Sequence, residues 1–480
     1  PMFIPLKTFR SARVDCKARS GLTLIEIMIA LVMTLIILLA MMRAFRYANE
    51  EIAKGRAMIE LSNQLRTSQE TLRADLAGVT ANMQPMARFG SPSGYFEYIE
   101  GPTRDNSALL AGRTADAIFG DVDDVLCFTT RSDGQAFRGR LFNAANSTTA
   151  IIESSLAEVI WWTDYQENPP GNNRLDYAED LAIRRRALLL RPDLDLSAIP
   201  ANNFAAVQRF FLNNDISARW IDSDGDGTRD RLVANSLEDL DKRENRFAHF
   251  TYPASLTDPY TATLATYPFA LDRATLASFR LALTGPGNLP NLSGQQTNFA
   301  GNDVMNTDAC AFDVRIFSPN VPVNQVNQIP MLPSDPGYSS GTLLTVGGFV
   351  DLNYDSVPFS SNTPAFSTAP AASPQNAALN FSFTSPNWLS STAGQDFVVD
   401  TFTRFYEVNG RDDDGTLGVD QAYNGLDDNS LNGVDDNTER ETLPPYPYQI
   451  SGIEVTLGVH ERTTKQSRRT SIVSKFAPGN

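Results

Sequence analysis

The sequence is poor in the residues that build catalytic centres and disulfide scaffolds. Its 480 residues include two histidines, His249 and His460, far apart and outside any motif, and three cysteines, too few for a disulfide framework. GxSxG, HExxH and P-loop patterns are absent. Lys and Arg number 40 against 56 for Asp and Glu, whereas nucleic acid binding needs a basic surplus. We therefore expect neither an enzyme nor a protein with nucleic acid as a general partner.

The composition is otherwise that of a folded protein. Hydrophobic residues make up 42% of the chain, an ordinary share for a globular protein, which argues against disorder throughout. The length predicts one large or two modest globular units.

The first 42 residues combine a basic segment with a long apolar run. Residues 1–21 contain five basic residues against Asp15, a net charge of +4, and the 21 residues from Leu22 to Met42 contain one charge, Glu26. As a helix this run reaches about 30 Å, enough to cross the hydrocarbon core of a bilayer. The positive-inside rule keeps the basic flank in the cytoplasm, so we expect a single-pass protein whose remainder is exported.

Three interpretations fit this arrangement, and the first is a plain signal anchor. A secretory signal peptide needs small residues after its apolar run, where this chain has Met41, Met42 and Arg43. The third interpretation is carried by Ser20-Gly21-Leu22-Thr23-Leu24-Ile25-Glu26, which closely resembles the prepilin peptidase site of type IV pilins. In that site a Gly ends the basic leader and a Glu stands fifth after the cut. The leader here is longer than usual, and Leu22 stands where many members have Phe.

The resemblance implies a protein that is processed and then assembled. It implies cleavage by prepilin peptidase between Gly21 and Leu22, followed by N-methylation of Leu22. A carboxylate inside a transmembrane helix costs about 2.5–3.5 kcal/mol on insertion scales, so Glu26 is expected to have a partner. The family implies that Glu26 meets the new amino terminus of a neighbouring subunit during filament assembly. Pairing with the amino terminus of its own chain is the alternative.

Other segments narrow the resemblance within the family. The runs "LRTSQETLRADL", "DDVLCFTTRS", "AEVIWW" and "RRRALLLRPDL" look like J-type minor pseudopilins of type II secretion or PilW-like minor pilins. This implies a structural subunit of the inner membrane, with its head exported to the periplasm or cell surface, that joins a filament at or near the tip. The implied partners are other minor and major pilins or pseudopilins and the inner-membrane assembly platform. The alternative function is a pilin-anchored, calcium-dependent module that binds a surface or an exported substrate.

The predicted fold class is α+β, with a long N-terminal helix packed on a large antiparallel β-rich head with long loops. Residues 1–21 form the leader, 22–42 the transmembrane half of the helix, 43–80 its amphipathic half, and 81–480 the head. Helical spacing predicts one buried apolar stripe, formed by Leu61, Leu65, Leu72, Leu76 and Val79. Gly78 marks the expected end of the helix, and Gly55 is a weak point that costs about 1 kcal/mol relative to Ala.

The head is predicted to be built from strands. Segments 124–131, 156–165, 181–191, 342–351, 396–408 and 453–460 have strand character, and 471–476 is expected to return beside the last. Stretches 285–340 and 355–395, rich in Pro, Asn, Ser and Thr, predict long loops. One of Trp161 and Trp162 is expected to face the core, and His460 to be solvated. A bridge between Cys127 and Cys310 and two separate buried thiols are both open.

Two acidic segments predict calcium binding, since calcium takes roughly six to eight oxygen ligands. The first, 222–230, matches the D-x-D-x-D-G start of a calcium loop, but Val233 stands where an EF-hand has its Glu. The second, 409–441, has a net charge of −8 and repeats Asn-Gly-x-Asp-Asp units. A solvated acidic loop is the alternative interpretation. The expected ligands are Asp222, Asp224, Asp226, Asp230, Asp412, Asp414, Asp427, Asp428, Asn429, Asp435, Asp436 and Asn437.

Overall fold

The computed structural model describes residues 23–83, 93–99, 124–143, 148–165, 181–199, 201, 204–224, 229–242, 245–247, 303–333, 335, 341–352, 398–401, 427, 430–431, 433–434, 450–461, 464 and 466–476. The chain divides into two compact units, Pro1–Arg56 and Ala57–Asn480, so that the boundary falls inside the first helix. The helices are α1 (Leu24–Ala77), α2 (Phe204–Asn213) and the 3-10 helix η2 (Asp239–Asp241).

The described strands all lie in the larger unit. They are β1 (Phe96–Ile99), β2 (Val125–Arg131), β3 (Phe137–Asn143), β4 (Thr148–Ser154), β5 (Leu156–Tyr165), β6 (Leu181–Leu189), β7 (Ala218–Ile221), β8 (Arg231–Ala234), β9 (Asp303–Thr307), β10 (Ala309–Val326), β11 (Ile329–Met331), β12 (Thr342–Val350), β13 (Val398–Asp400), β14 (Gly452–Glu461) and β15 (Gln466–Lys475). Every pairing between them is antiparallel. A long N-terminal helix and an antiparallel β-rich body confirm the predicted α+β class at this level.

Helix α1 continues for 54 residues and passes through Gly55 without a break. Its exposed face carries ion pairs one turn apart, Arg46 with Glu50 and Arg66 with Glu70, each with an Nε to Oε1 distance of 2.9 Å. Exposed pairs of this kind each stabilise a helix by about 0.2–0.5 kcal/mol. The leucines of the predicted stripe are buried: Leu61, Leu65, Leu72 and Leu76.

The end of α1 is set by contact with β2. The Arg131 amide donates to the Gly78 carbonyl at 2.7 Å, and Thr130 Oγ1 donates to the Asp75 carbonyl at 2.7 Å. A Cβ atom at Gly78 would lie 2.1 Å from the Arg131 carbonyl oxygen, so a larger residue does not fit there. The structure therefore confirms the helix end predicted near Gly78, and close backbone approach is the reason for the glycine.

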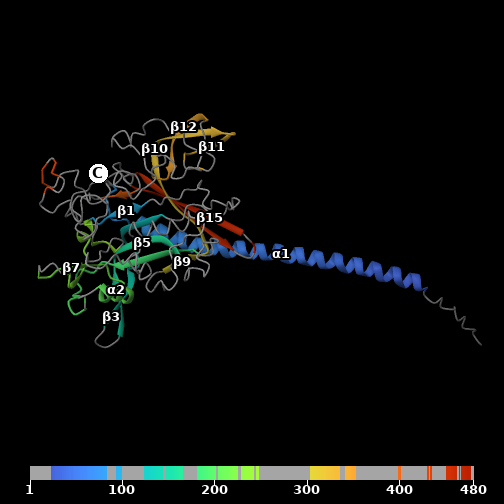
Figure 1. Ribbon diagram of the computed structural model, residues 1–480, viewed down its shortest axis with the longest axis horizontal. Coiled ribbons are helices and arrows are strands. Elements are labelled where there is room, and N and C mark those ends of the chain that lie inside the picture. The colour runs from blue at the N-terminus through green and yellow to red at the C-terminus, as the bar shows by residue number, and fades with distance from the viewer. Residues whose placement is uncertain are drawn as a thin grey trace, which may run out of the picture. The chain divides into compact units, whose positions relative to one another are not determined.

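The central sheet has six strands in the order β13-β1-β2-β5-β6-β9 and is covered on both faces (Figure 1). Trp161 packs in the core that contains Leu72 of α1, whereas Trp162 packs in the core that contains Phe211 of α2. Their exposed fractions are 0% and 3%. The sequence predicted that one of the two tryptophans faces a core, and the structure buries both because each face of β5 has its own core.

The second sheet is ordered β11-β10-β14-β15, with β12 also paired to β10. Strands β14 and β15 confirm the predicted pairing of the two C-terminal segments. The loop predicted over 285–340 is wrong for residues 303–331, which form β9, β10 and β11. Pro319 and Pro322 in β10 suggested a loop, because proline interrupts a sheet. Both lie beyond the stretch that pairs with β14, and Pro319 sits where the register with β12 shifts.

Strand β10 is long enough to leave the body of the sheet. Its pairing with β14 ends at Ile316, and its remaining residues pair with β11 and β12 in a three-stranded arm (Figure 1). The other strand predictions agree with β2, β5, β6 and β12, and β13 covers the described part of 396–408. The segment 355–395 lies outside the described residues.

Two side-chain predictions are decided by burial. His460 is 5% exposed, so the expectation of a solvated histidine is wrong; its strand is covered on this face as well. Cys127 and Cys310 are buried and unbridged, which selects the two separate thiols from the two alternatives. Burial raises the pKa of Cys310 to about 11.

A buried carboxylate attaches α1 to the central sheet. Asp75 is 3% exposed, and Arg185 donates to both of its oxygens, from Nε at 2.7 Å and from Nη2 at 2.9 Å. The indole Nε1 of Trp161 donates to the same carboxylate at 2.9 Å. Because a bidentate Arg and an indole converge on one group, the helix has a single position against β5 and β6.

Replacing this carboxylate should destabilise the protein strongly. We expect Asp75→Ala to lower the free energy of unfolding by about 3 kcal/mol or more, because Arg185 is left buried without its bidentate partner. Denaturant unfolding of the full-length protein in detergent measures the change. Glu70→Ala is the matched control on the same helix, and loss of its exposed pair should cost about 0.5 kcal/mol. Equal losses for the two variants would contradict this role of Asp75.

Candidate functional site

The first candidate site is the start of α1. From Leu24 to Met42 the large hydrophobic side chains are between 51% and 78% exposed. Within the described residues, α1 is the one helix long and apolar enough to cross a membrane. Since exposed apolar surface of this extent is unfavourable in water, the segment is suited to a membrane.

The first turn of α1 is closed by a reciprocal pair of side chains. Glu26 Oε2 accepts hydrogen bonds from the Thr23 amide at 2.9 Å and from Thr23 Oγ1 at 3.0 Å. In return, the Glu26 amide donates to Thr23 Oγ1 at 3.3 Å. This is a capping box, in which the residue before the helix and the third helical residue satisfy each other's backbone groups. One carboxylate oxygen is therefore held by the chain's own backbone.

The capping box assigns a role that the sequence interpretation missed. It considered Glu26 only as the partner of an amino terminus, although the spacing T-x-x-E before an apolar run is the pattern of a capping box. The other two residues of the expected processing site, Gly21 and Leu22, lie outside the described residues. What the structure places is therefore Glu26 alone, in the first turn of the apolar helix.

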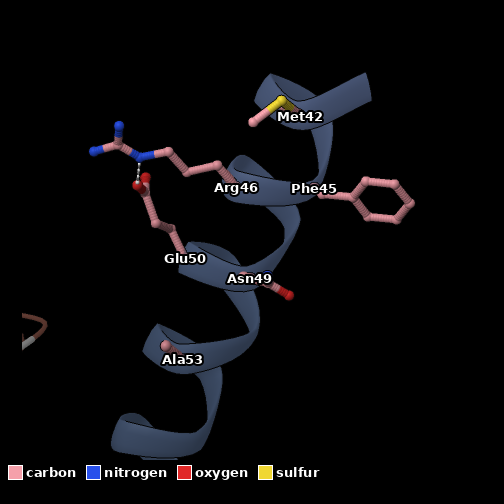
Figure 2. A pocket seen from close by; sticks show the side chains of 6 residues that line it. All are labelled: Met42, Phe45, Arg46, Asn49, Glu50 and Ala53. Atoms are coloured by element: carbon pink, nitrogen blue, oxygen red, sulfur yellow. Dashed lines mark hydrogen bonds and ion pairs between the residues drawn. The ribbon is translucent and has the colours of Figure 1, made fainter. Parts of the chain in front are cut away.

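Just beyond the apolar run, the surface of α1 has a shallow hollow lined by Met42, Phe45, Arg46, Asn49, Glu50 and Ala53. Figure 2 shows the Arg46 and Glu50 side chains meeting on one side of the helix, while Phe45 projects from the opposite side. The helix therefore carries the Arg46–Glu50 pair on one flank, while Phe45 and the uncharged Asn49 project from the other.

The acidic segment 222–230 joins β7 to β8, which pair as antiparallel strands, and its residues 225–228 lie outside the described residues. The Asp230 carboxylate accepts hydrogen bonds from the Ser223 amide at 3.0 Å and from Ser223 Oγ at 2.8 Å. Asp222 Oδ1 accepts from the Asp224 amide at 3.2 Å. Asp222, Asp224 and Asp230 thus lie at the two ends of this segment, and Asp226 lies outside the described residues.

Among the described residues no group of three or more His, Cys, Asp or Glu side chains is arranged to hold a metal ion. In the second acidic segment Asp427 is described and is exposed. The other predicted ligands there lie outside the described residues: Asp412, Asp414, Asp428, Asn429, Asp435, Asp436 and Asn437.

The head also contains a buried charge cluster that sequence reasoning did not identify. Arg246 Nη1 donates to Glu97 at 3.1 Å and to Asp400 at 2.6 Å, and all three side chains are at most 1% exposed. The guanidinium also lies 4.1 Å from the centre of the Tyr95 ring. Since its partners are about 150 residues away in the sequence, spacing carries no signal for it. The cluster joins β1 and β13 to the segment after η2.

Glu158 on β5 forms the neighbouring part of this interior. Burial raises the pKa of Glu158, although hydrogen bonds from Ser217, the Phe247 amide and Tyr95 act in the opposite direction. Those bonds measure 2.6, 2.9 and 2.8 Å. With an exposed fraction of 0%, this carboxyl group holds three segments of the head together.

No protein-family model, curated protein or solved structure matches this chain. The features that point to a function are those of the chain itself: an exposed apolar helix with a carboxylate in its first turn, and a β-rich body with an acidic hairpin.

Proposed function

We propose that the protein is a minor pilin or pseudopilin, anchored by α1 and assembled through it at or near the tip of a type II secretion pseudopilus or type IV pilus. One observation carries the proposal: Glu26 lies in the first turn of an exposed apolar helix, directly after a basic segment that ends in Gly21. A transmembrane carboxylate is costly, so its presence at this position indicates a function.

The capping box offsets part of the cost of placing Glu26 in a transmembrane helix. Pairing with a neighbouring subunit during assembly would offset the remainder. Oε2 of Glu26 is occupied by Thr23. Ionised carboxylates accept more hydrogen bonds than these two, so a cation can still approach the group. Cleavage after Gly21 would produce an α-amino group on Leu22 that is mostly protonated at neutral pH. An amino group from a neighbouring subunit would then pair with Glu26 in a low-dielectric environment.

The proposal defines the partners and the location. Prepilin peptidase removes residues 1–21 and the new amino terminus is methylated. The subunit stays in the inner membrane with its head exported until the assembly platform moves it into a filament with other minor and major pilins. Leu61 to Leu76 of α1 are already packed in the core of the head, so this part of the helix would enter the filament together with the head.

Processing is the direct test. We expect the mature protein to begin at Leu22, because the basic leader and the apolar helix meet there, and to carry one N-methyl group. Mass spectrometry of the N-terminal peptide from native membranes measures both. An intact leader, or a cut after Met42, would contradict the proposed function.

A second test separates the charge of Glu26 from its capping role. Glu26→Gln keeps a capping box, since Gln also serves at this position, whereas Glu26→Leu removes both the box and the charge. If pairing with a protonated amino terminus drives assembly, both variants should insert into the membrane and both should enter filaments poorly. Co-purification with other minor pilins measures incorporation, with Glu50→Gln as control. Normal incorporation of Glu26→Gln would show that capping, not charge, is the requirement.

Calcium binding by the head is the second candidate, and it rests on the sequence pattern of 222–230. Asp222, Asp224 and Asp230 come from the two ends of the segment that joins β7 to β8, and carboxylate oxygens are ligands that calcium prefers. Asp230 is held by Ser223, which would fix one ligand before a cation arrives. On this proposal the head is a calcium-dependent module for a surface or an exported substrate, carried by the same anchor.

Calcium should raise the melting temperature of the full-length protein. With a Kd of about 10⁻⁴–10⁻³ M, about 10 mM calcium stabilises the native state by roughly 1–3 kcal/mol. Thermal unfolding in calcium and in chelator measures this difference. Asp224→Ala should abolish it, while Asp133→Ala, in the exposed turn between β2 and β3, should not. Identical melting in calcium and in chelator would contradict the site.

A further inference from the structure

The part of α1 that follows the membrane-suited segment has a regular seam of large and small residues. Met41, Phe45, Ala48, Ile52 and Gly55 are separated by four, three, four and three positions, the spacing of a heptad seam. The three large side chains are 53%, 62% and 54% exposed, and Ala48 and Gly55 are exposed as well. All five lie within the smaller unit of the chain.

Gly55 is unexplained by the fold of the chain itself. An exposed glycine in a helix interior costs about 1 kcal/mol relative to alanine. A Cβ atom placed on Gly55 would meet nothing within 4 Å, so no contact inside the described chain requires its small size. Small residues at a helix surface allow a second helix to approach closely, and Ala48 lies one heptad before Gly55 on the same side.

The other side of the helix at this level is charged. Figure 2 shows Arg46 paired with Glu50 on the flank opposite Phe45, at an Nε to Oε1 distance of 2.9 Å. A helix that is apolar on one flank and charged on the other buries the apolar flank against a neighbour. The seam, not the hollow around the ion pair, is therefore the surface expected to pack against another helix.

Two charged residues border the seam and indicate which partner fits. Glu51 directly precedes Ile52, and Arg56 directly follows Gly55, on the other edge. In two parallel helices in register, Glu51 of each copy faces Arg56 of the other, since these positions are five residues apart. In an antiparallel pair each residue would face its own like charge. The present partner of Glu51 is Lys54 at 2.9 Å, an exposed pair that contributes little.

We propose that this seam is the contact between two copies of this chain, with their α1 helices parallel and in register. In register, identical positions meet, so Ala48 lies beside Ala48 and Gly55 beside Gly55 of the other copy, which lets the two helices approach closely. Two Glu51–Arg56 pairs form across the edges. The parallel orientation rests on the proposed function, because two copies anchored in one membrane by the same basic leader necessarily point the same way.

Disulfide trapping locates the contact. Ala48→Cys on the seam and Ala53→Cys off the seam are compared in the full-length protein in membranes, with Cys16 replaced by Ser. A disulfide needs Cα atoms less than about 7 Å apart, which two seam positions meet and two outer positions do not. We expect a band of twice the subunit mass for Ala48→Cys and no such band for Ala53→Cys. Equal bands, or an Ala48→Cys adduct with a different protein alone, would overturn the proposal.

Charge exchange then tests the register. Glu51→Arg and Arg56→Glu should each reduce the Ala48→Cys dimer at least about fivefold, the effect of two exposed ion pairs of about 0.5 kcal/mol each. The double variant should restore the dimer, because both pairs re-form with reversed sign. Glu50→Arg is the matched control on the outer flank and should leave the dimer unchanged. Failure of the double variant to restore it would overturn the in-register arrangement.

The result is separable from the proposed function. A dimer in a protein whose leader is intact would support the contact and refute the pilin proposal. A correctly cleaved protein that forms no dimer would support the pilin proposal and refute the contact.

Discussion

The fold of the larger unit depends on the ion pair and hydrogen bonds that one buried carboxylate receives. Asp75 is buried on α1, and its two oxygens are bound by Arg185 and Trp161, which come from adjacent strands of the central sheet. Burying an ionised group is costly unless it is paired and hydrogen-bonded, so the helix is stable only where all three groups meet. Hydrophobic packing of Leu72 and Leu76 would allow some sliding along the sheet. The carboxylate removes that freedom for the part of α1 that packs on the sheet.

Because the central sheet is covered on both faces, other polar side chains on its strands are also buried and need hydrogen-bond partners. Glu97, Glu158 and Arg186 all lie on its strands with exposed fractions of 0%. Each is accommodated by a partner from another segment: Arg246 for Glu97, Ser217 for Glu158, and the Phe211 carbonyl for Arg186. Hydrogen bonds are electrostatically stronger in a protein interior than in water, so these contacts between distant segments favour one arrangement of the segments around the sheet.

The predictable parts of this fold are those determined by neighbouring residues. The leucine stripe of α1, the end at Gly78 and the alternation of β14 depend on local periodicity, and each was predicted. Strand β10 was missed because Pro319 breaks the local pattern, although a shift in register accommodates it. Arg186 looks like an outward residue of a strand, and its burial depends on partners beyond that strand, the carbonyl groups of Phe211 and Asn214. At the helix start Glu26 was recognised, whereas Thr23 was overlooked because only its charged partner was considered.

The two halves of β10 differ in burial. Its first half pairs with β14 and is buried, while its outer half pairs with β11 and with a β12 that exposes Leu343 by 58% and Val346 by 57%. Backbone pairing with little burial gives a low local free energy of opening. The amides of this arm are therefore expected to exchange with solvent more readily than those of the buried sheet around Asp75. A protein built in this way can deform at its periphery without loosening the connection between its helix and its head.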